Sequence, residues 1–154
     1  MTDLMDTFVE NRWIVQPNHA NYHDMAHGGT VMKWMDEVGA MAAMRFAGQP
    51  CVTARMDQVN FERPVPVGDI ALVEAYVYDA GRTSVKVRVQ AYREDPLTSE
   101  RELTTESFFV YVAIDENQNP TEVPSLTARS DAGRELRDEA LEDEEAMTSE
   151  REQS

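Results

Sequence analysis

The residues of this chain that could carry out chemistry gather between an asparagine and an aspartate in its first third. Asn21 is followed by the pair Gly28-Gly29 and then by Asp36. Glycines at the start of a helix leave unpaired backbone N–H groups near the positive end of the helix dipole, where negative charge is favoured. A carboxylate can activate water or attack a carbonyl carbon itself. An anion site and a carboxylate on one helix therefore suit the hydrolysis of an acyl group.

The segment that positions Asp36 has the pattern of an amphipathic helix, which Gly48 and Pro50 end. With a step of about 100° per residue, one face of this helix collects Val31, Met35, Val38, Gly39, Ala42 and Phe46. The opposite face carries Lys33, Glu37 and Met44. Asp36 lies at the edge of the apolar face among small residues, which predicts a cleft beside it. The alternative is a solvated boundary position, the commoner place for an acidic residue in such a helix.

The motif around these residues resembles that of a known family. From Pro17 to Glu37 it reads P-x-x-A-N-x-x-x-x-x-H-G-G-x-x-x-x-x-M-D-E, which is similar to the acyl-CoA thioesterases of the hotdog superfamily, in the cytosolic acyl-CoA hydrolase group. Three further segments resemble the same family in the same order: VNFERPVPVGD (59–69), GRTSVKV (81–87) and FFVYVAID (108–115). Because four segments agree in order, the resemblance is specific, and it covers residues 10–124.

The resemblance implies an enzyme that converts acyl-CoA and water to a free carboxylic acid and coenzyme A, without a metal or a redox cofactor. It assigns the catalytic role to Asp36, either as general base or as nucleophile. It also implies that the Asn21 amide orients the attacking water or donates to the thioester carbonyl. The backbone N–H of Gly29 is the leading oxyanion donor. Without the resemblance, Asn21 could be a turn residue and the glycine pair an ordinary helix start.

Eight residues around this centre are predicted to bind the substrate. His27 matches the H-G-G of the family and is expected to line the thioester pocket, while Gly28 lets the carbonyl approach because it has no Cβ atom. The FERP and GRTS segments lie near the bound coenzyme in that family, which adds Asn60, Phe61, Arg63, Arg82, Thr83 and Ser84. Guanidinium groups of the two arginines suit phosphate oxygens. The alternative for each arginine is a solvated position at a strand end.

Metal binding is not predicted. His19, His23 and His27 repeat at intervals of four, which would align three zinc ligands on a helix. However, Pro17 and the loop-like composition argue against a helix there, and H-E-x-x-H is absent. Cys51 is the only cysteine, which excludes an internal disulfide and a cysteine-rich metal site. It is interpreted as a small buried apolar residue at the start of a strand.

After Pro50 the apolar period changes from 3.6 to 2. Strands are predicted over 7–15, from 51 onward with a bulge before 59, and over 70–79, 84–92 and 103–115. Segment 70–79 is almost uniformly apolar, which indicates a central strand buried on both faces. Five strands and one helix, joined mostly by short turns, predict an α+β fold whose antiparallel sheet wraps around a central helix. The hotdog resemblance implies the same architecture. One hotdog domain is expected over 1–128, and residues 1–6 are expected to be frayed.

The composition limits the partners. The formal net charge is −15, and Lys33 and Lys86 are the only lysines. Such a surface disfavours nucleic acid and anionic membranes as partners and resembles proteins of high-salt cytoplasm. There is no apolar run of about 20 residues and no secretory signal, so the expected location is the cytoplasm. Residues 129–154 carry 10 acidic and 4 basic side chains, and are expected to form a disordered acidic tail.

The resemblance also bears on assembly and on rival functions. In that family the Asn and Asp of one site come from opposing hotdog units, so this chain is expected to form at least a homodimer, with a hexamer of three dimers as the larger assembly. The alternative function is a non-hydrolytic module that binds or senses acyl-CoA. The presence of both Asn21 and Asp36 argues against that alternative. A hotdog hydratase is disfavoured because its motif is missing.

Overall fold

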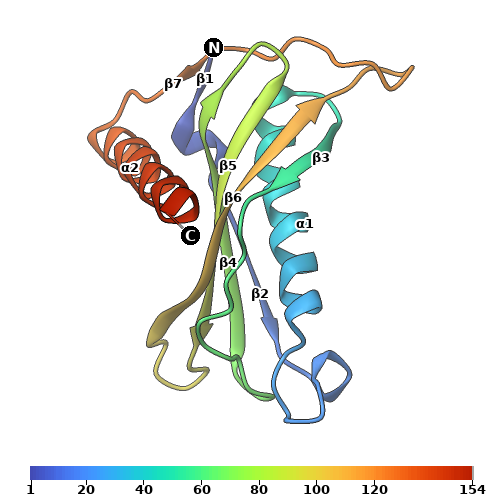
Figure 1. Cartoon of the computed structure of the whole chain (residues 1–154), viewed down its shortest axis with the longest axis vertical. Coiled ribbons are helices and arrows are strands. Elements are labelled where there is room, and N and C mark those ends of the chain that lie inside the picture. The colour runs from blue at the N-terminus through green and yellow to red at the C-terminus, as the bar shows by residue number, and fades with distance from the viewer. Residues whose placement is uncertain (154) are drawn as a thin grey trace.

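A curved sheet of five antiparallel strands wraps around one long helix in a computed structural model of the chain (Figure 1). The structure describes residues 1–153, and side chains for residues 1–149. The strand order is β2-β4-β5-β6-β3. The strands are β2 Val9–Ile14, β3 Cys51–Met56, β4 Ile70–Ala80, β5 Ser84–Glu94 and β6 Arg101–Ala113. The predicted α+β hotdog fold is therefore confirmed.

The central helix, α1 (Gly28–Ala47), buries the face that the sequence pattern predicted. All six residues of the predicted apolar face are buried, and Trp34 and Ala43 widen it. This face packs against the concave side of the sheet, mainly on β4 and β5. The helix ends at Gly48, whose φ of 68° lies in the left-handed region that a glycine adopts without a Cβ clash.

A second hydrophobic core, separate from the one between α1 and the sheet, lies on the outer face of the sheet. Because side chains alternate along a strand, Val73, Ala75 and Val77 of β4 face α1, whereas Tyr76 and Tyr78 face outward. The outward side chains pack with Leu4, Phe108, Ala128 and Ala140. Residues 71–78 are consequently buried on both faces, as predicted for this strand.

A second helix, α2 (Asp131–Gln153), crosses the outer face of the sheet where a disordered tail was expected (Figure 1). Leu136, Ala140 and Met147 form a thin apolar stripe that contacts the outer core, with Ala140 fully buried. The expectation of disorder is wrong for the described residues. A helix this polar is stabilised mainly by tertiary packing, and its contacts with the outer core are not visible in the local sequence. The division into a domain over 1–128 and a separate tail stays a prediction.

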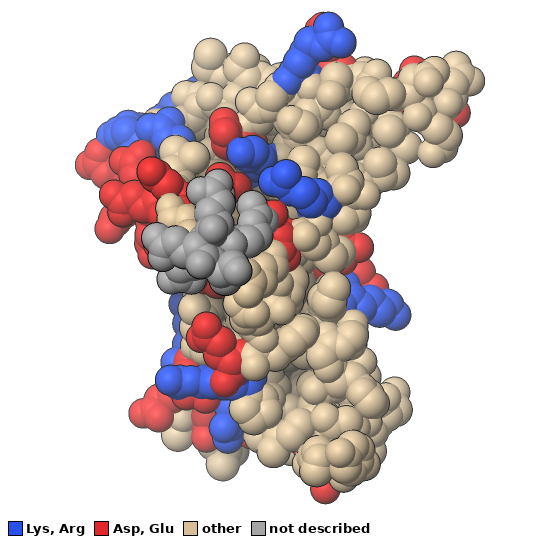
Figure 2. Space-filling model, in the orientation of Figure 1, with Lys and Arg blue, Asp and Glu red and all other residues tan. Residues whose placement is uncertain are grey.

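Ion pairs also join α2 to the sheet. The Arg88 guanidinium, on β5, is 3% exposed and donates to Asp143 at 2.5 Å and to Glu106 at 3.0 Å. The Tyr78 hydroxyl donates to Glu144 at 2.6 Å. The side of α2 that faces away from the sheet is acidic, as the cluster of acidic side chains in Figure 2 shows. Some of the negative charge on α2 thus faces a buried cation, and the rest faces solvent.

The N-terminal residues are ordered rather than frayed. Strand β1 (Thr2–Asp3) pairs in parallel with β7 (Leu126–Thr127), and the short helix η1 (Leu4–Thr7) inserts Leu4 into the outer core. The partners of β1 lie more than a hundred residues away, and Thr7 of η1 contacts Val77, 70 residues away, so the local pattern could not reveal these contacts. None of the helices in the described part of the chain is long and apolar enough to span a membrane.

Candidate active site

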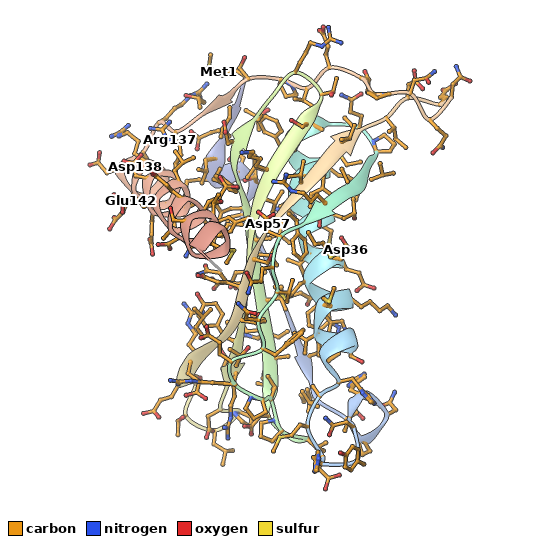
Figure 3. The ribbon with its side chains drawn as sticks, viewed as in Figure 1. Met1, Asp36, Asp57, Arg137, Asp138 and Glu142 are labelled. Atoms are coloured by element: carbon orange, nitrogen blue, oxygen red, sulfur yellow. The ribbon has the colours of Figure 1, made fainter. Side chains whose placement is uncertain are left out.

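Asp36 lies about halfway along α1, half-buried and beside strands β3 and β6 (Figure 3). Its Oδ1 accepts hydrogen bonds from Thr53 Oγ1 at 2.8 Å and from the Tyr111 hydroxyl at 3.0 Å. The same hydroxyl lies 3.1 Å from the backbone carbonyl oxygen of Asp36. No donor among the described residues reaches Oδ2. We call Asp36, Thr53 and Tyr111 the Asp36 cluster.

The pairing of β3 with β6 builds this cluster. Thr53 and Tyr111 are direct partners in the antiparallel ladder, so both side chains leave the sheet on the face that α1 covers. The register shifts between Thr53 and Arg55, which places a bulge immediately after the threonine. A bulge was predicted before residue 59, and the structure places it nearer the start of β3. Bulges re-aim side chains next to functional sites.

The neighbouring titratable groups are held neutral. Tyr111 is fully buried, and burial together with the Asp36 charge raises the pKa of Tyr111 well above its ordinary value. Its hydroxyl therefore stays protonated and acts as a donor. Burial raises the pKa of Cys51 to about 11, so this thiol is a poor nucleophile at neutral pH. Cys51 begins β3, as the sequence indicated, but it is half-buried against the edge of the core rather than buried within it.

The N-terminus of α1 opens into a cavity of about 490 Å³, which we call the helix-mouth cavity. Its walls are mainly apolar and include Met25, Val31, Phe61, Pro64 and Val65. Asn21, Gly28 and Arg63 also line it. Four of the predicted site residues, from two distant parts of the sequence, therefore meet around one cavity. Asp36 is not among the lining residues.

Asn21 uses only part of its amide to shape the loop. Its Oδ1 accepts from the backbone N–H of His23 at 2.8 Å and of Met25 at 3.3 Å, so the asparagine is a turn residue. The Nδ2 group has no acceptor among the residues that the structure describes. The amide can thus stabilise the turn through its oxygen and still offer its N–H donors to a ligand.

The two glycines at the start of α1 differ in their surroundings. A Cβ atom on Gly28 would lie 3.3 Å from the Phe61 ring, whereas one on Gly29 would point into open space. Within the described chain, neither backbone N–H has an acceptor. Residue His27 caps α1 without a side-chain hydrogen bond; it is exposed and lies outside the cavity wall. The open N–H groups at this end favour an anion.

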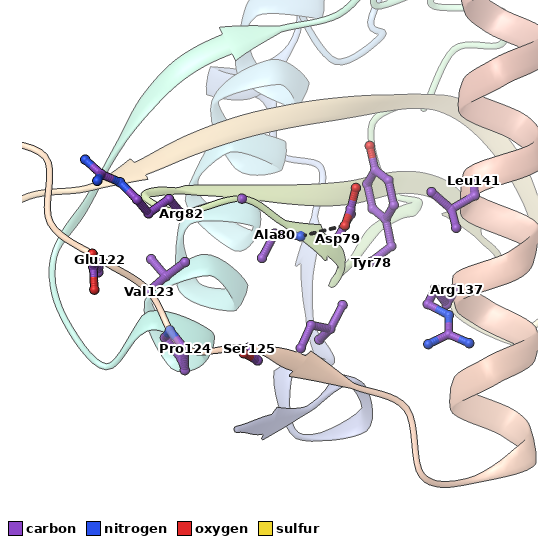
Figure 4. Close-up of a pocket in the computed structure, with 12 residues that line it drawn as sticks. Tyr78, Asp79, Ala80, Arg82, Glu122, Val123, Pro124, Ser125, Arg137 and Leu141 are labelled. Atoms are coloured by element: carbon purple, nitrogen blue, oxygen red, sulfur yellow. Dashed lines mark hydrogen bonds between the residues drawn. The ribbon is translucent and has the colours of Figure 1, made fainter.

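The predicted coenzyme-binding residues are dispersed. Arg63 lines the helix-mouth cavity but pairs with Glu102 at 2.8 Å. The backbone carbonyl of Asn60 accepts from Thr105, and this asparagine lines a different pocket. Arg82, Thr83 and Ser84 lie at the β4–β5 turn, away from the cavity. Arg82 borders a separate pocket of about 560 Å³, which Arg137 of α2 also lines (Figure 4).

The three histidines do not align. Only His19 lies in a helical segment, η2 (Pro17–His19), where its Nδ1 accepts from the Gln16 backbone at 3.0 Å. Its ring packs edge-on against Trp34 with centroids 5.0 Å apart. In the described part of the chain, no group of three or more His, Cys, Asp or Glu residues is arranged to hold a metal ion.

The anion site and the carboxylate occupy separate places within one chain. Gly29 and Asp36 are seven residues apart on α1, which puts them on one side of the helix but about 10 Å apart along its axis. Thr53 and Tyr111 were not predicted, because their contacts with Asp36 depend on strand pairing. One signal was present in the sequence: Gly39, a glycine inside a predicted helix, lies three residues after Asp36.

Comparisons with known proteins identify the family. The model of the thioesterase superfamily matches residues 23–100. YkhA of Bacillus subtilis, an uncharacterized acyl-CoA thioester hydrolase, is 35% identical over 117 residues, covering 76% of this chain and 68% of that protein. An acyl-CoA hydrolase of Staphylococcus aureus, solved with butyryl coenzyme A, coenzyme A and coenzyme A disulfide, has a TM-score of 0.85 and 31% identity. The two chains overlap over 99% of this chain and 93% of that one.

Further structures of the S. aureus protein carry single alanine replacements of an asparagine, an aspartate and a threonine. An acyl-CoA thioesterase described as hexameric has a TM-score of 0.85 and 33% identity, covering 97% of this chain and 96% of that chain. The sequence similarity, the shared fold and the family match agree with one another. The chain belongs to the thioesterase superfamily and is a thioesterase.

Proposed function

We propose that this thioesterase hydrolyses acyl-CoA to a free carboxylic acid and coenzyme A, with Asp36 as its catalytic carboxylate. The observation that carries the proposal is the asymmetry of this carboxylate. Its Oδ1 accepts two hydrogen bonds from the protein, whereas Oδ2 has no donor within the described residues. A carboxylate held by one oxygen presents the other to a reactant. The names of the related proteins supply the substrate class.

The variants of the S. aureus hydrolase support a functional role for three residues of this chain. The asparagine, aspartate and threonine replaced in that protein are separated by 15 and 17 positions. Asn21, Asp36 and Thr53 of this chain have the same two separations. Two of these three residues were predicted from the sequence, and the third is the one that donates to Asp36 in the structure.

The reaction can follow either of two routes from Oδ2 of Asp36. As a general base, the carboxylate takes a proton from a water molecule whose oxygen attacks the thioester carbon. As a nucleophile, it attacks the carbon itself and forms an anhydride that water then hydrolyses. In both routes the C–S bond breaks and the coenzyme A thiolate leaves and takes up a proton. Thr53 and Tyr111 hold Oδ1 in both.

The helix-mouth cavity suits the thioester carbonyl. Asn21 lines this cavity, and Gly29 follows the lining residue Gly28. Nδ2 of Asn21 and the backbone N–H of Gly29 are donors without partners in the described chain, and donors of this kind stabilise the negative charge that develops on the carbonyl oxygen. The apolar walls around Phe61 and Val65 suit an acyl chain or the pantetheine arm. Because Oδ1 of Asn21 is engaged in its turn, its role is that of a donor to the carbonyl.

Two copies of the chain would complete one site. About 10 Å along α1 separate Gly29 from Asp36, which is too far for both to act on one carbonyl group. The partner half-site can be supplied by a second chain. Strand β3, which carries Thr53, is an edge strand of the sheet, and its Val52 side chain is 44% exposed. Related thioesterases are described as hexameric, which supports an assembly of three such dimers.

Hydrolysis of an acyl-CoA panel, from acetyl to palmitoyl, by wild type and by Asp36→Asn tests this function. Coenzyme A release should fall about 100-fold or more in the variant, while coenzyme A still binds in calorimetry. Glu37→Gln is the matched control, since Glu37 is exposed on the other side of α1. Binding without turnover by the wild-type protein would instead indicate the sensing module. Normal turnover by a folded Asp36→Asn variant would remove Asp36 from the mechanism.

A further inference from the structure

We propose that Tyr111 is a positioning residue for Asp36, and that Gly39 is a glycine because it must leave room for the Tyr111 hydroxyl. The inference rests on the catalytic role of Asp36 proposed above. It gives Tyr111 of the Asp36 cluster a specific role, and it adds Gly39 to the residues that build the site. Gly39 acts only through Tyr111 and does not touch the substrate.

The Tyr111 hydroxyl contacts both the side chain and the main chain of one residue. It lies 3.0 Å from Oδ1 and 3.1 Å from the backbone carbonyl oxygen of Asp36. A group that contacts both atoms fixes the carboxylate relative to its own main chain and so favours one side-chain rotamer of Asp36. It therefore determines where Oδ2 points.

Tyr111 is better placed than Thr53 to hold this geometry. Its side chain is fully buried, and β6 is paired on both sides, with β5 and with β3. Thr53 lies on the edge strand and is exposed in the single chain, so its hydroxyl can exchange partners with water. The tyrosine supplies the rigid contact, and the threonine supplies a second donor from the open side.

Gly39 is explained by the same contact. A Cβ atom at this position would lie 2.4 Å from the Tyr111 hydroxyl oxygen and 3.2 Å from Cγ2 of Val89. Among the described glycines, positive φ occurs at Gly48 and Gly68, so Gly39 has no conformational need to be a glycine. A glycine inside a helix is less stable than an alanine. The need to leave space for the Tyr111 hydroxyl therefore explains why residue 39 is a glycine.

The tyrosine acts as a donor and does not compete with Asp36 for the proton of the attacking water. Burial and the nearby carboxylate raise the pKa of Tyr111, so the phenolate form is not populated at neutral pH. A hydroxyl that stays protonated can orient the carboxylate and leave the proton transfer to Oδ2. This separates a positioning role from a role as general base.

The first test is Tyr111→Phe, which keeps the ring and removes the hydroxyl. We expect kcat to fall about 10-fold, because a hydrogen bond to a charged group is lost and the carboxylate is no longer oriented. KM should stay within about 2-fold, since the helix-mouth cavity is untouched. Tyr78→Phe is the matched control: it is also buried, but its hydroxyl donates to Glu144 on the far face of the sheet. That variant should lose stability and keep its kcat.

The second test is the pair Gly39→Ala and Gly39→Ala/Tyr111→Phe. Gly39→Ala should lower kcat, because the added methyl group displaces the hydroxyl. Removing the hydroxyl relieves this closest contact, so the double variant should melt at a higher temperature than Gly39→Ala and have the kcat of Tyr111→Phe alone. If the two losses in kcat instead multiply, Gly39 acts independently of Tyr111 and its assignment is wrong.

Asp36→Asn separates the two levels of the argument. If Asp36→Asn is inactive and Tyr111→Phe has the kcat of wild type, the positioning role is wrong and the proposed function stands. If Asp36→Asn is itself active, the proposed mechanism fails, and a loss in Tyr111→Phe would reflect structure alone. A loss of kcat in Tyr111→Phe that is matched by Tyr78→Phe would also overturn the inference.

Discussion

Thr53 and Tyr111 stand directly opposite each other in the β3–β6 ladder, and both donate a hydrogen bond to the same oxygen of Asp36. One cross-strand pair thus holds one oxygen of a helical carboxylate. The arrangement is short-range in space, although Tyr111 is 75 residues from Asp36 in the sequence. Because the two donors share one acceptor, the effects of removing each hydroxyl can be compared directly.

Thr53→Val is expected to reduce kcat about 10-fold with little change in KM, because the valine keeps the shape of the side chain but removes one donor to Oδ1. Steady-state kinetics with a single acyl-CoA check this. Thr98→Val, in the exposed β5–β6 loop, is the control and should match wild type. A raised KM with unchanged kcat would place Thr53 in substrate binding rather than beside the carboxylate.

Mixing inactive chains is expected to restore activity if the site is shared between subunits. Asn21→Ala lacks the proposed carbonyl donor, and Asp36→Asn lacks the carboxylate. A dimer formed from one chain of each contains one site with both residues intact, so a random mixture should regain about a quarter of wild-type activity. Mass spectrometry of differently tagged chains verifies the exchange. If exchange occurs and no activity returns, both residues of a site belong to one chain.

Arg88→Met is expected to lower the free energy of unfolding by about 3 kcal/mol or more, because it removes the cation from a buried ionic cluster and leaves Glu106 and Asp143 facing each other. Urea unfolding followed by circular dichroism measures the change. Arg137→Met is the control, since this arginine lies on α2 but the side chain of its ion-pair partner, Asp138, is 70% exposed. Equal effects of the two substitutions would contradict the assigned role of Arg88.

The free energy of unfolding is expected to fall as the pH rises above about 9. Burial raises the pKa values of five groups in the folded chain: Cys51, Tyr76, Tyr78, Tyr92 and Tyr111. The unfolded chain therefore releases these protons first, so their stabilising effect is complete at neutral pH and is lost in alkali. Urea midpoints between about pH 8 and pH 11 measure the slope. Tyr78→Phe should make it shallower, and a flat profile would contradict the shifts.

The sequence alone determined the elements that follow from local patterns. The helical period, the glycine pair and Gly48 defined α1, and the period of two defined the strands. These signals are local because backbone geometry repeats over a few residues. The family motif also selected Asn21, Gly28, Phe61 and Arg63, which the fold gathers around one cavity.

The tertiary structure alone decided the contacts made across strands and between helix and sheet. Strand register placed Thr53 and Tyr111 on Asp36, and no local periodicity encodes which residues of two strands face each other. Segment 131–153 is helical because its thin apolar stripe packs on the outer aromatic side chains of the sheet. Without such a surface, a helix this polar would have little to stabilise it. Gly29 and Asp36 lie about 10 Å apart along α1, and the order of residues in a motif does not convey this separation.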